Sequence, residues 1–221
     1  MTKKVSVTVI VPTYNRDLYI GRCIRSLLDQ SLDREKYEII VINDGSKDKT
    51  DTILNAFKDE VIILSNKKNK GLSYSLNKGI RCSKGRFVIR VDSDDYVNHE
   101  FLKYLQMHLL SNNEMQAVCC DYYLVDDKEN IIKKMNSDTN PIGCGIMFRV
   151  ESLFKIGLYD KNLKVHEEKD LRIRFLKHNK IHRISLPLYR YRKHAKNITK
   201  NKKNMKKYFK KLLAKHNKKR K

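Results

Sequence analysis

The chain has 221 residues and a formal net charge of +23, from 48 basic and 25 acidic side chains. This length and the 40% hydrophobic residues are typical of one folded domain with a sizeable core. The five cysteines include no Cys-x-x-Cys pair, which argues against a zinc site, and no apolar run approaches the roughly 20 residues of a membrane span. We therefore expect a cytoplasmic protein, and its charge indicates an anionic partner or surface.

The first half of the chain alternates between predicted strands and helices. β-Branched runs predict strands at residues 5–11, 38–42, 61–64 and 87–91. Apolar residues at helical spacing predict helices at 17–28, 47–57 and 72–82. This βαβ alternation is typical of a parallel sheet between helices.

The pattern changes after residue 95. Helices are predicted at 100–110, 151–156 and 166–178, and strands at 117–125, 131–135 and 143–148. The polar turn at 126–130 joins two of these strands as a hairpin, so the second half should add an antiparallel part to the sheet.

The C-terminal segment differs from the rest of the chain, because residues 200–221 contain twelve Lys or Arg and no acidic residue. We expect a domain at 1–199 followed by this Lys-rich segment. A helix from about Asn204 would gather a narrow apolar stripe from Tyr208, Phe209, Leu212, Leu213 and His216. Such a helix can bind an anionic membrane surface, and the alternative is a solvated lysine tail.

Three of the predicted strands end in polar turns, at residues 12–15, 43–46 and 92–95. The carboxyl ends of parallel strands meet at one edge of a sheet, where ligands bind. Asp92 and Asp94 are two residues apart, so both carboxylates can reach one divalent cation if the strand geometry persists. The alternative is an acidic turn that caps the helix beginning near Asn98.

In this order and spacing the sequence resembles the family 2 glycosyltransferases, which use nucleotide-diphosphate sugars. The resemblance covers roughly residues 5 to 199. Its motifs are Val9-Ile10-Val11-Pro12-Thr13-Tyr14-Asn15, Asp44-Gly45-Ser46-x-Asp48, Asn69-x-Gly71-Leu72-Ser73, Asn77-x-Gly79-Ile80, Gly85-x-x-Val88, Asp92-Ser93-Asp94-Asp95, Gly157-x-Tyr159-Asp160, Glu167-Glu168-x-Asp170-Leu171 and Tyr191-Arg192-x-His194. It implies the GT-A fold, a Rossmann-like, mostly parallel mixed sheet in an α/β protein, with a small antiparallel part in the second half.

The resemblance also implies the donor site. Its nucleotide-binding residues would be Pro12, Thr13, Tyr14, Asp44, Gly71, Asp92 and Ser93. A base ring can pack on a tyrosine, and a carboxylate can accept a hydrogen bond from a uracil-type N–H. Asp94 would hold Mn²⁺ or Mg²⁺ against the two phosphates, with Asp92, Asp95 and His194 as further ligands.

The acidic cluster Glu167-Glu168-x-Asp170 matches the place where inverting members of the family carry the general base. The resemblance favours Glu168, with Asp170 next and Glu167 in the same cluster. Two residues depart from the usual pattern, because Asn43 stands where an aspartate is common and Glu168 is longer by one methylene than the usual aspartate. Helix stabilisation is the alternative role of these acids.

From these motifs we expect metal-dependent, inverting transfer of a single sugar from a nucleotide-diphosphate sugar, of UDP type, to a glycan or lipid-linked acceptor. A sugar nucleotidyltransferase is the second enzyme class, but its basic, glycine-rich phosphate loop is missing after the first strand. Nucleic-acid binding through the lysines is the third alternative. The Lys-rich segment offers only Tyr208 and Phe209 for stacking on bases.

Overall fold

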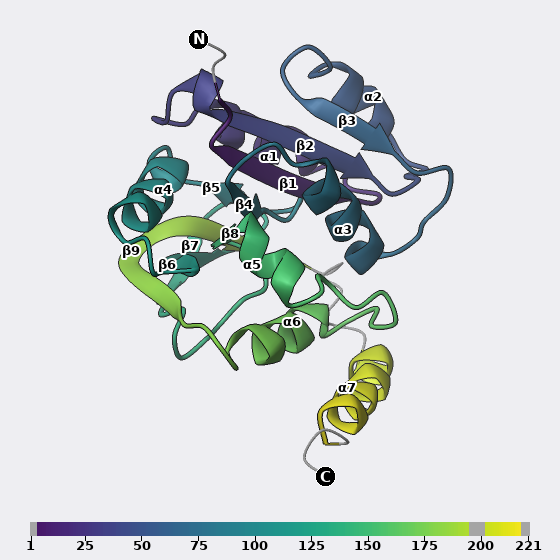
Figure 1. Cartoon of the computed structure of the whole chain (residues 1–221). Coiled ribbons are helices and arrows are strands. Elements are labelled where there is room, and N and C mark those ends of the chain that lie inside the picture. The colour runs from purple at the N-terminus through teal and green to yellow at the C-terminus, as the bar shows by residue number, and fades with distance from the viewer. Residues whose placement is uncertain (1–3, 195–201, 218–221) are drawn as a thin grey trace.

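The computed structural model describes residues 4–194 and 202–217 and contains a nine-stranded sheet between two layers of helices (Figure 1). One half of the sheet is parallel and consists of β1 (Val7–Thr13), β2 (Tyr37–Asn43), β3 (Ile62–Ser65) and β4 (Phe87–Arg90). Every residue of β1 and β2 is buried, as their apolar runs predict. β1 extends beyond the predicted end at residue 11 to include Pro12 and Thr13.

The other half of the sheet is mixed. It consists of β5 (Tyr96–Val97), β6 (Ala117–Val125), β7 (Ile131–Met135), β8 (Ile146–Arg149) and β9 (Ile181–Arg192). The strand order is β3-β2-β1-β4-β8-β6-β9-β5, and β7 pairs with β6. Four strand pairs are parallel and four antiparallel, so the antiparallel part is larger than expected. The predicted α/β class with a mixed sheet is confirmed.

Six helices cover the two faces of the sheet, and a 3₁₀ turn (Arg34–Lys36) precedes β2. The helices α1 (Ile20–Leu28), α2 (Thr50–Asn55) and α4 (Phe101–Ser111) share a core with one face. The helices α3 (Leu72–Cys82), α5 (Val150–Lys155) and α6 (Glu167–Phe175) pack on the other. The bounds of α3, β6 and β7 agree with the prediction, whereas α6 ends at Phe175, earlier than expected.

The C-terminal helix α7 (Lys202–Asn217) packs against the segment that leads into α6 (Figure 1). Tyr208 and Leu212 are buried with Leu163 and Val165. The predicted helix is confirmed, but three members of its stripe face the protein, because His216 also contacts Asp170. Among the described residues, no helix combines the length and the apolar character needed to cross a bilayer.

Candidate active site

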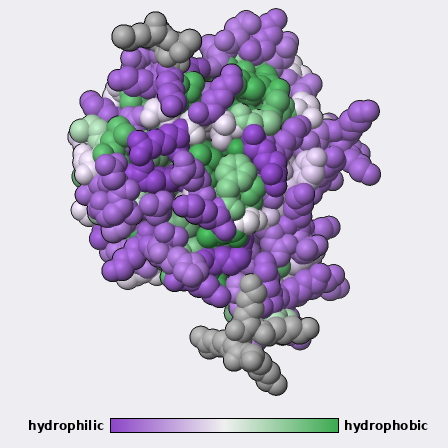
Figure 2. Space-filling model, viewed as in Figure 1, coloured by the Kyte–Doolittle hydropathy of each residue, from purple (hydrophilic) through white to green (hydrophobic). Residues whose placement is uncertain are grey.

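A cavity of about 630 Å³ lies at the carboxyl ends of β1, β2 and β4, and α6 and α7 border it. Ten residues predicted for the site line it: Pro12, Thr13, Tyr14, Asp44, Gly71, Asp92, Ser93, Asp94, Glu167 and Glu168. Three others, Asp95, Asp170 and His194, do not. Figure 2 shows that the surface in this view is mainly hydrophilic, with hydrophobic patches near its middle.

The turn after β2 forms one end of the cavity. Asp44 is buried, and its carboxylate accepts hydrogen bonds from the backbone N–H groups of Lys70 and Gly71, at 2.9 and 2.8 Å. These bonds hold the loop before α3 beside the end of β2. The hydroxyl oxygen of Thr13 is buried here without a hydrogen-bond partner among the described residues. This end therefore has an unpaired polar group and the Tyr14 ring available for a ligand.

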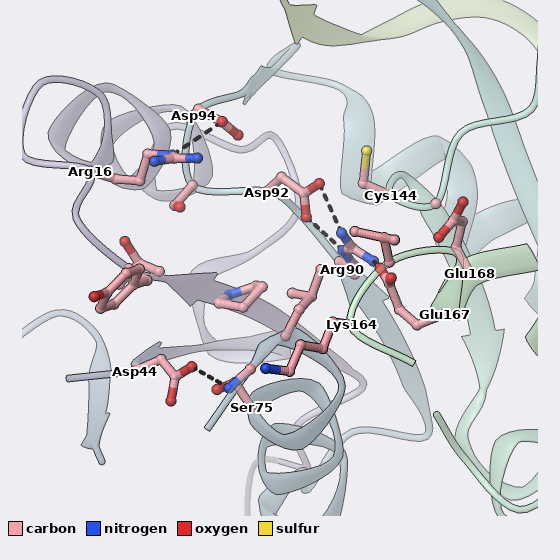
Figure 3. A pocket seen from close by; sticks show the side chains of 18 of the residues that line it. Arg16, Asp44, Ser75, Arg90, Asp92, Asp94, Cys144, Lys164, Glu167 and Glu168 are labelled. Atoms are coloured by element: carbon pink, nitrogen blue, oxygen red, sulfur yellow. Dashed lines mark hydrogen bonds and ion pairs between the residues drawn. The ribbon is translucent and has the colours of Figure 1, made fainter. Parts of the chain in front are cut away.

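Arg90, the last residue of β4, crosses the centre of the cavity (Figure 3). Its guanidinium group donates two hydrogen bonds to Asp92, at 2.6 and 3.0 Å, and one to Glu167 at 3.2 Å. A guanidinium group matches the geometry of a carboxylate in such a bidentate pair. Arg90 thus joins two acidic segments. One is the loop of residues 91–95 between β4 and β5, called the acid loop below, and the other is the acid cluster in the first turn of α6.

Asp94 lies on the other side of the acid loop. Its Oδ2 atom is 3.2 Å from the Arg16 guanidinium nitrogen and 2.8 Å from Nε2 of His194. Burial alone would raise the pKa of Asp94, but the hydrogen bond with His194 and the charge of Arg16 outweigh it and lower that pKa. The side chain therefore lines the cavity as a carboxylate.

Asp95 fastens the acid loop to β9. One of its carboxylate oxygens accepts from the Tyr189 hydroxyl at 2.7 Å, and the other from the backbone N–H of Arg192 at 2.8 Å. Burial, with the charges of Asp94 and Asp92, raises the pKa of Asp95 well above its usual range. Because both carboxylate oxygens of Asp95 bind β9, this residue has a structural role: it holds the acid loop against that strand.

The first turn of α6 carries the base candidates. Glu168 lines the cavity, and a side chain at Gly143 would collide with it, since an added Cβ would lie 2.7 Å from Cβ of Glu168. Glu167 is buried, and burial raises its pKa to about 7 despite the charge of Arg90. Both acids lie across the cavity from Asp94 and on the far side of Arg90 (Figure 3).

Asp170 points away from the cavity and is fully buried beside α7. Its carboxylate contacts Arg174 at 2.8 Å, Lys215 at 2.7 Å and His216 at 2.9 Å. Burial would raise the pKa of Asp170, but hydrogen bonds from Lys215 and Arg174 outweigh it and lower that pKa. The contacts with Lys215 and His216 hold α7 on α6. Asp170, a predicted candidate for the base, therefore lies outside the cavity and has a structural role.

The chemistry of the site fits a divalent cation. Asp92 and Asp94 present carboxylate oxygens to the cavity, and the imidazole of His194 is hydrogen-bonded to Asp94 behind it. Carboxylate oxygens suit both Mg²⁺ and Mn²⁺. Asp92, Asp95 and Cys144 also cluster within 4.8 Å, but burial raises the pKa of the Cys144 thiol well above its usual range. A protonated thiol is a poor ligand for a hard cation.

Sequence reasoning missed Arg16, Arg90, Lys164, His166 and Met205, which also line the cavity. Arg90 could have been found, because a charged residue at the end of a buried strand, two positions before an acid motif, requires a partner. Met205 lies 37 residues beyond Glu168 in the sequence, and no local pattern points to its position.

Comparison with known proteins identifies the family of the chain. The model of a family described as glycosyl transferase family 2 matches residues 8–166, and the chain belongs to this family. An uncharacterized glycosyltransferase of Rickettsia prowazekii is 31% identical over 212 residues, which are 87% of this chain and 65% of that protein. A poly(ribitol-phosphate) beta-glucosyltransferase of Bacillus spizizenii is 30% identical over 71% of this chain and 26% of its own length. The chain thus spans less than two thirds of these relatives.

Solved structures share the fold. Residues 1–349 of TarS from S. aureus, in complex with UDP-GlcNAc, align with a TM-score of 0.76 and 22% identity, over 89% of this chain and 61% of that one. A mannosyltransferase from Pyrobaculum calidifontis, in complex with GDP-Man and Mn²⁺, aligns with a TM-score of 0.73 and 18% identity, over 98% and 65%. At these identities the likeness shows the GT-A fold.

Proposed function

We propose that this glycosyltransferase moves one hexose from a nucleotide-diphosphate sugar, of UDP type, to a hydroxyl group of a glycan or lipid-linked acceptor, with inversion at the anomeric carbon. The observation that carries the proposal is the arrangement of one cavity. Asp44 lies at one end together with Thr13 and Tyr14, Asp92 and Asp94 lie on the loop after β4, and Glu168 lies across the cavity from Asp94. A nucleotide, a diphosphate and an acceptor hydroxyl would occupy these places in that order.

The residues on the two sides of the cavity would share the reaction. Glu168 would take the proton of the acceptor hydroxyl, whose oxygen forms a bond to the anomeric carbon while the bond to the diphosphate oxygen breaks. One base opposite the leaving group supports a single displacement, and hence inversion. Asp92, Asp94 and His194 would hold Mn²⁺ or Mg²⁺, which neutralises charge on a diphosphate. Arg16 and Arg90 keep these carboxylates in position before a cation binds.

Sugar transfer gives the first prediction. Glu168→Gln should abolish transfer but leave binding of the nucleotide sugar unchanged, whereas Asp94→Ala should abolish activity in the presence of Mn²⁺ while the protein stays folded. We would screen UDP-glucose, UDP-GlcNAc and GDP-mannose for hydrolysis and thermal stabilisation, with Mn²⁺ and with excess chelator. Full activity in chelator would overturn the role of the cation. Activity of Glu168→Gln together with loss in Asp170→Asn would show that the base is misassigned.

We also propose that the outer side of α7 places the enzyme on an anionic membrane surface, close to lipid-linked or envelope glycans. Five exposed lysines support this: Lys203, Lys206, Lys207, Lys210 and Lys211. Phe209 and Leu213 remain 43% and 44% exposed beside them. Because Tyr208 and Leu212 are buried inward, attraction between charges would contribute more than insertion of apolar side chains.

A further inference from the structure

His166, directly before α6, combines two features that cost stability. Its backbone is left-handed, with φ 65° and ψ 15°, a conformation that favours glycine and that a β-carbon makes unfavourable. Its side chain is buried, with an exposed fraction of 4%. Unfavourable backbone conformations in non-glycine residues concentrate at functional sites. This residue also directly precedes Glu167, is two positions from Glu168 and lines the same cavity.

Helix α7 determines which nitrogen of the His166 ring carries the proton. Nε2 lies 3.0 Å from the backbone oxygen of Met205, and a carbonyl oxygen only accepts hydrogen bonds. Nε2 therefore donates, and in the neutral ring Nδ1 keeps a lone pair that accepts. Nδ1 is buried and has no hydrogen-bond partner among the described residues. An unpaired buried nitrogen of this kind requires an explanation.

The ring is held on two sides by α7. The backbone oxygen of Met205 accepts a hydrogen bond from Nε2 of His166, and Met205 also lines the cavity. The Phe209 ring packs edge to face against the His166 ring, with 5.6 Å between the ring centroids. The helix itself is fixed on α6 by the contacts of Lys215 and His216 with Asp170. Both ends of α7 therefore act on the first turn of α6, where the base candidates lie.

We propose that His166 is an acceptor-binding residue: its Nδ1 atom accepts a hydrogen bond from a second hydroxyl group of the acceptor sugar while the reacting hydroxyl faces Glu168. This inference rests on the proposed function. Contacts with two hydroxyl groups would fix the orientation of the sugar at the base. Because Nδ1 can only accept in this tautomer, it selects a hydroxyl-bearing sugar over a phosphate or carboxylate at this point. Since Nδ1 is buried in the free protein, acceptor binding also displaces neighbouring side chains of the cavity wall.

Two substitutions at this position separate ligand binding from backbone effects. His166→Asn and His166→Gly both introduce residues that adopt a left-handed conformation readily. Only asparagine offers an oxygen near the place of Nδ1. We would use the nucleotide sugar that the wild type hydrolyses and octyl β-glycosides of glucose, galactose and N-acetylglucosamine as acceptors. His166→Gly should raise the acceptor KM about tenfold, the loss of roughly one hydrogen bond, while His166→Asn stays within about threefold.

His178→Asn, at an exposed histidine outside the cavity, serves as the control and should leave the acceptor KM unchanged. In ¹⁵N-histidine-labelled full-length protein, the Nδ1 resonance of His166 should identify the Nε2–H tautomer and shift when an octyl glycoside is added. Equal acceptor KM values for the asparagine and glycine variants, or an Nδ1 resonance that none of the glycosides moves, would overturn the proposal. Failure of the wild type to hydrolyse any nucleotide sugar would instead count against the proposed function.

Discussion

Arg90 contacts carboxylates from two distant parts of the chain, Asp92 and Glu167. Its side chain is only 10% exposed, and a buried charge is tolerated when it is paired and hydrogen-bonded. Without this guanidinium group, two carboxylates would face each other across the cavity. Arg90 therefore sets the distance between Asp92 and Glu167 across the cavity.

Glu167 gives a prediction for the pH dependence of stability. Its pKa is raised from 4.5 to about 7, so the folded protein binds this proton more tightly than the unfolded chain. The stabilisation that the protonated Glu167 side chain provides is complete below its unfolded-state pKa and is lost as the pH rises through about 7. The free energy of unfolding of the wild type should therefore fall by at most about 3 kcal/mol between roughly pH 5 and 8. Glutamine does not titrate, so this fall should be absent in Glu167→Gln. Denaturant titrations of both proteins across this range would measure it, and parallel curves would contradict it.

Gly143 gives a prediction for the base. In Gly143→Ala the new methyl group would lie 2.7 Å from Cβ of Glu168, so the glutamate must move. We expect kcat to fall about tenfold or more, with the KM for the donor unchanged, because small displacements of a reacting group slow catalysis. Gly21→Ala is the control, since its methyl group would meet nothing closer than 3.4 Å. An unchanged kcat in Gly143→Ala would show that Glu168 is not the base or that it tolerates the shift.

Most residues proposed for donor binding line the cavity, and their position could be predicted from the sequence because they directly follow strongly apolar strands. The acid cluster of α6 could not be resolved in the same way. Glu168 and Asp170 both lie in the first turn, and only the packing of α7 reveals that Asp170 faces Lys215 while Glu168 faces the cavity. The role of Asp95 depends likewise on Tyr189, 94 residues away.

At the scale of elements, the prediction missed β9. This strand contains Pro187 and several arginines, and its pairing with β6 shifts in register around Asp121. Proline and an irregular alternation both argue against a strand in sequence reasoning. The strand forms because β6 and β5 pair with it on either side. Tertiary neighbours, which a local pattern does not contain, therefore decide its structure.

Helix α7 gives a prediction at the same scale. Leu212 is 3% exposed and packs with Tyr208, Leu163 and Val165. Leu212→Ala should destabilise the docked helix by about 2 kcal/mol and speed hydrogen exchange of its amides about thirtyfold. The neighbouring Leu213, 44% exposed, provides the matched control Leu213→Ala. Equal exchange in the two variants would mean that the buried face does not hold α7.

At the scale of the whole molecule, positive charge is unevenly distributed, since α7 contains seven lysines and no acidic residue. The triple variant Lys206→Glu/Lys207→Glu/Lys210→Glu should lose most binding to vesicles that contain anionic lipid, because each lysine near such a surface contributes about 1 kcal/mol. Lys58→Glu/Lys133→Glu/Lys134→Glu changes the net charge equally, at exposed positions elsewhere. Co-sedimentation with vesicles at two salt concentrations would measure the binding of the wild type and of both triple variants. Equal loss in both triple variants, or equal binding to neutral vesicles, would rule out α7 as the contact.

The acid loop is fastened at both ends. It leaves β4 at Arg90 and enters β5 at Tyr96, and β5 pairs with β9, whose Tyr189 and Arg192 hold Asp95. Because side chains alternate along a strand, one inserted residue would either turn β5 over or move Asp94 away from Arg16 and His194. The number of residues in this loop is therefore fixed by the fold, so insertions and deletions can accumulate in other surface turns of this chain but not between Arg90 and Tyr96.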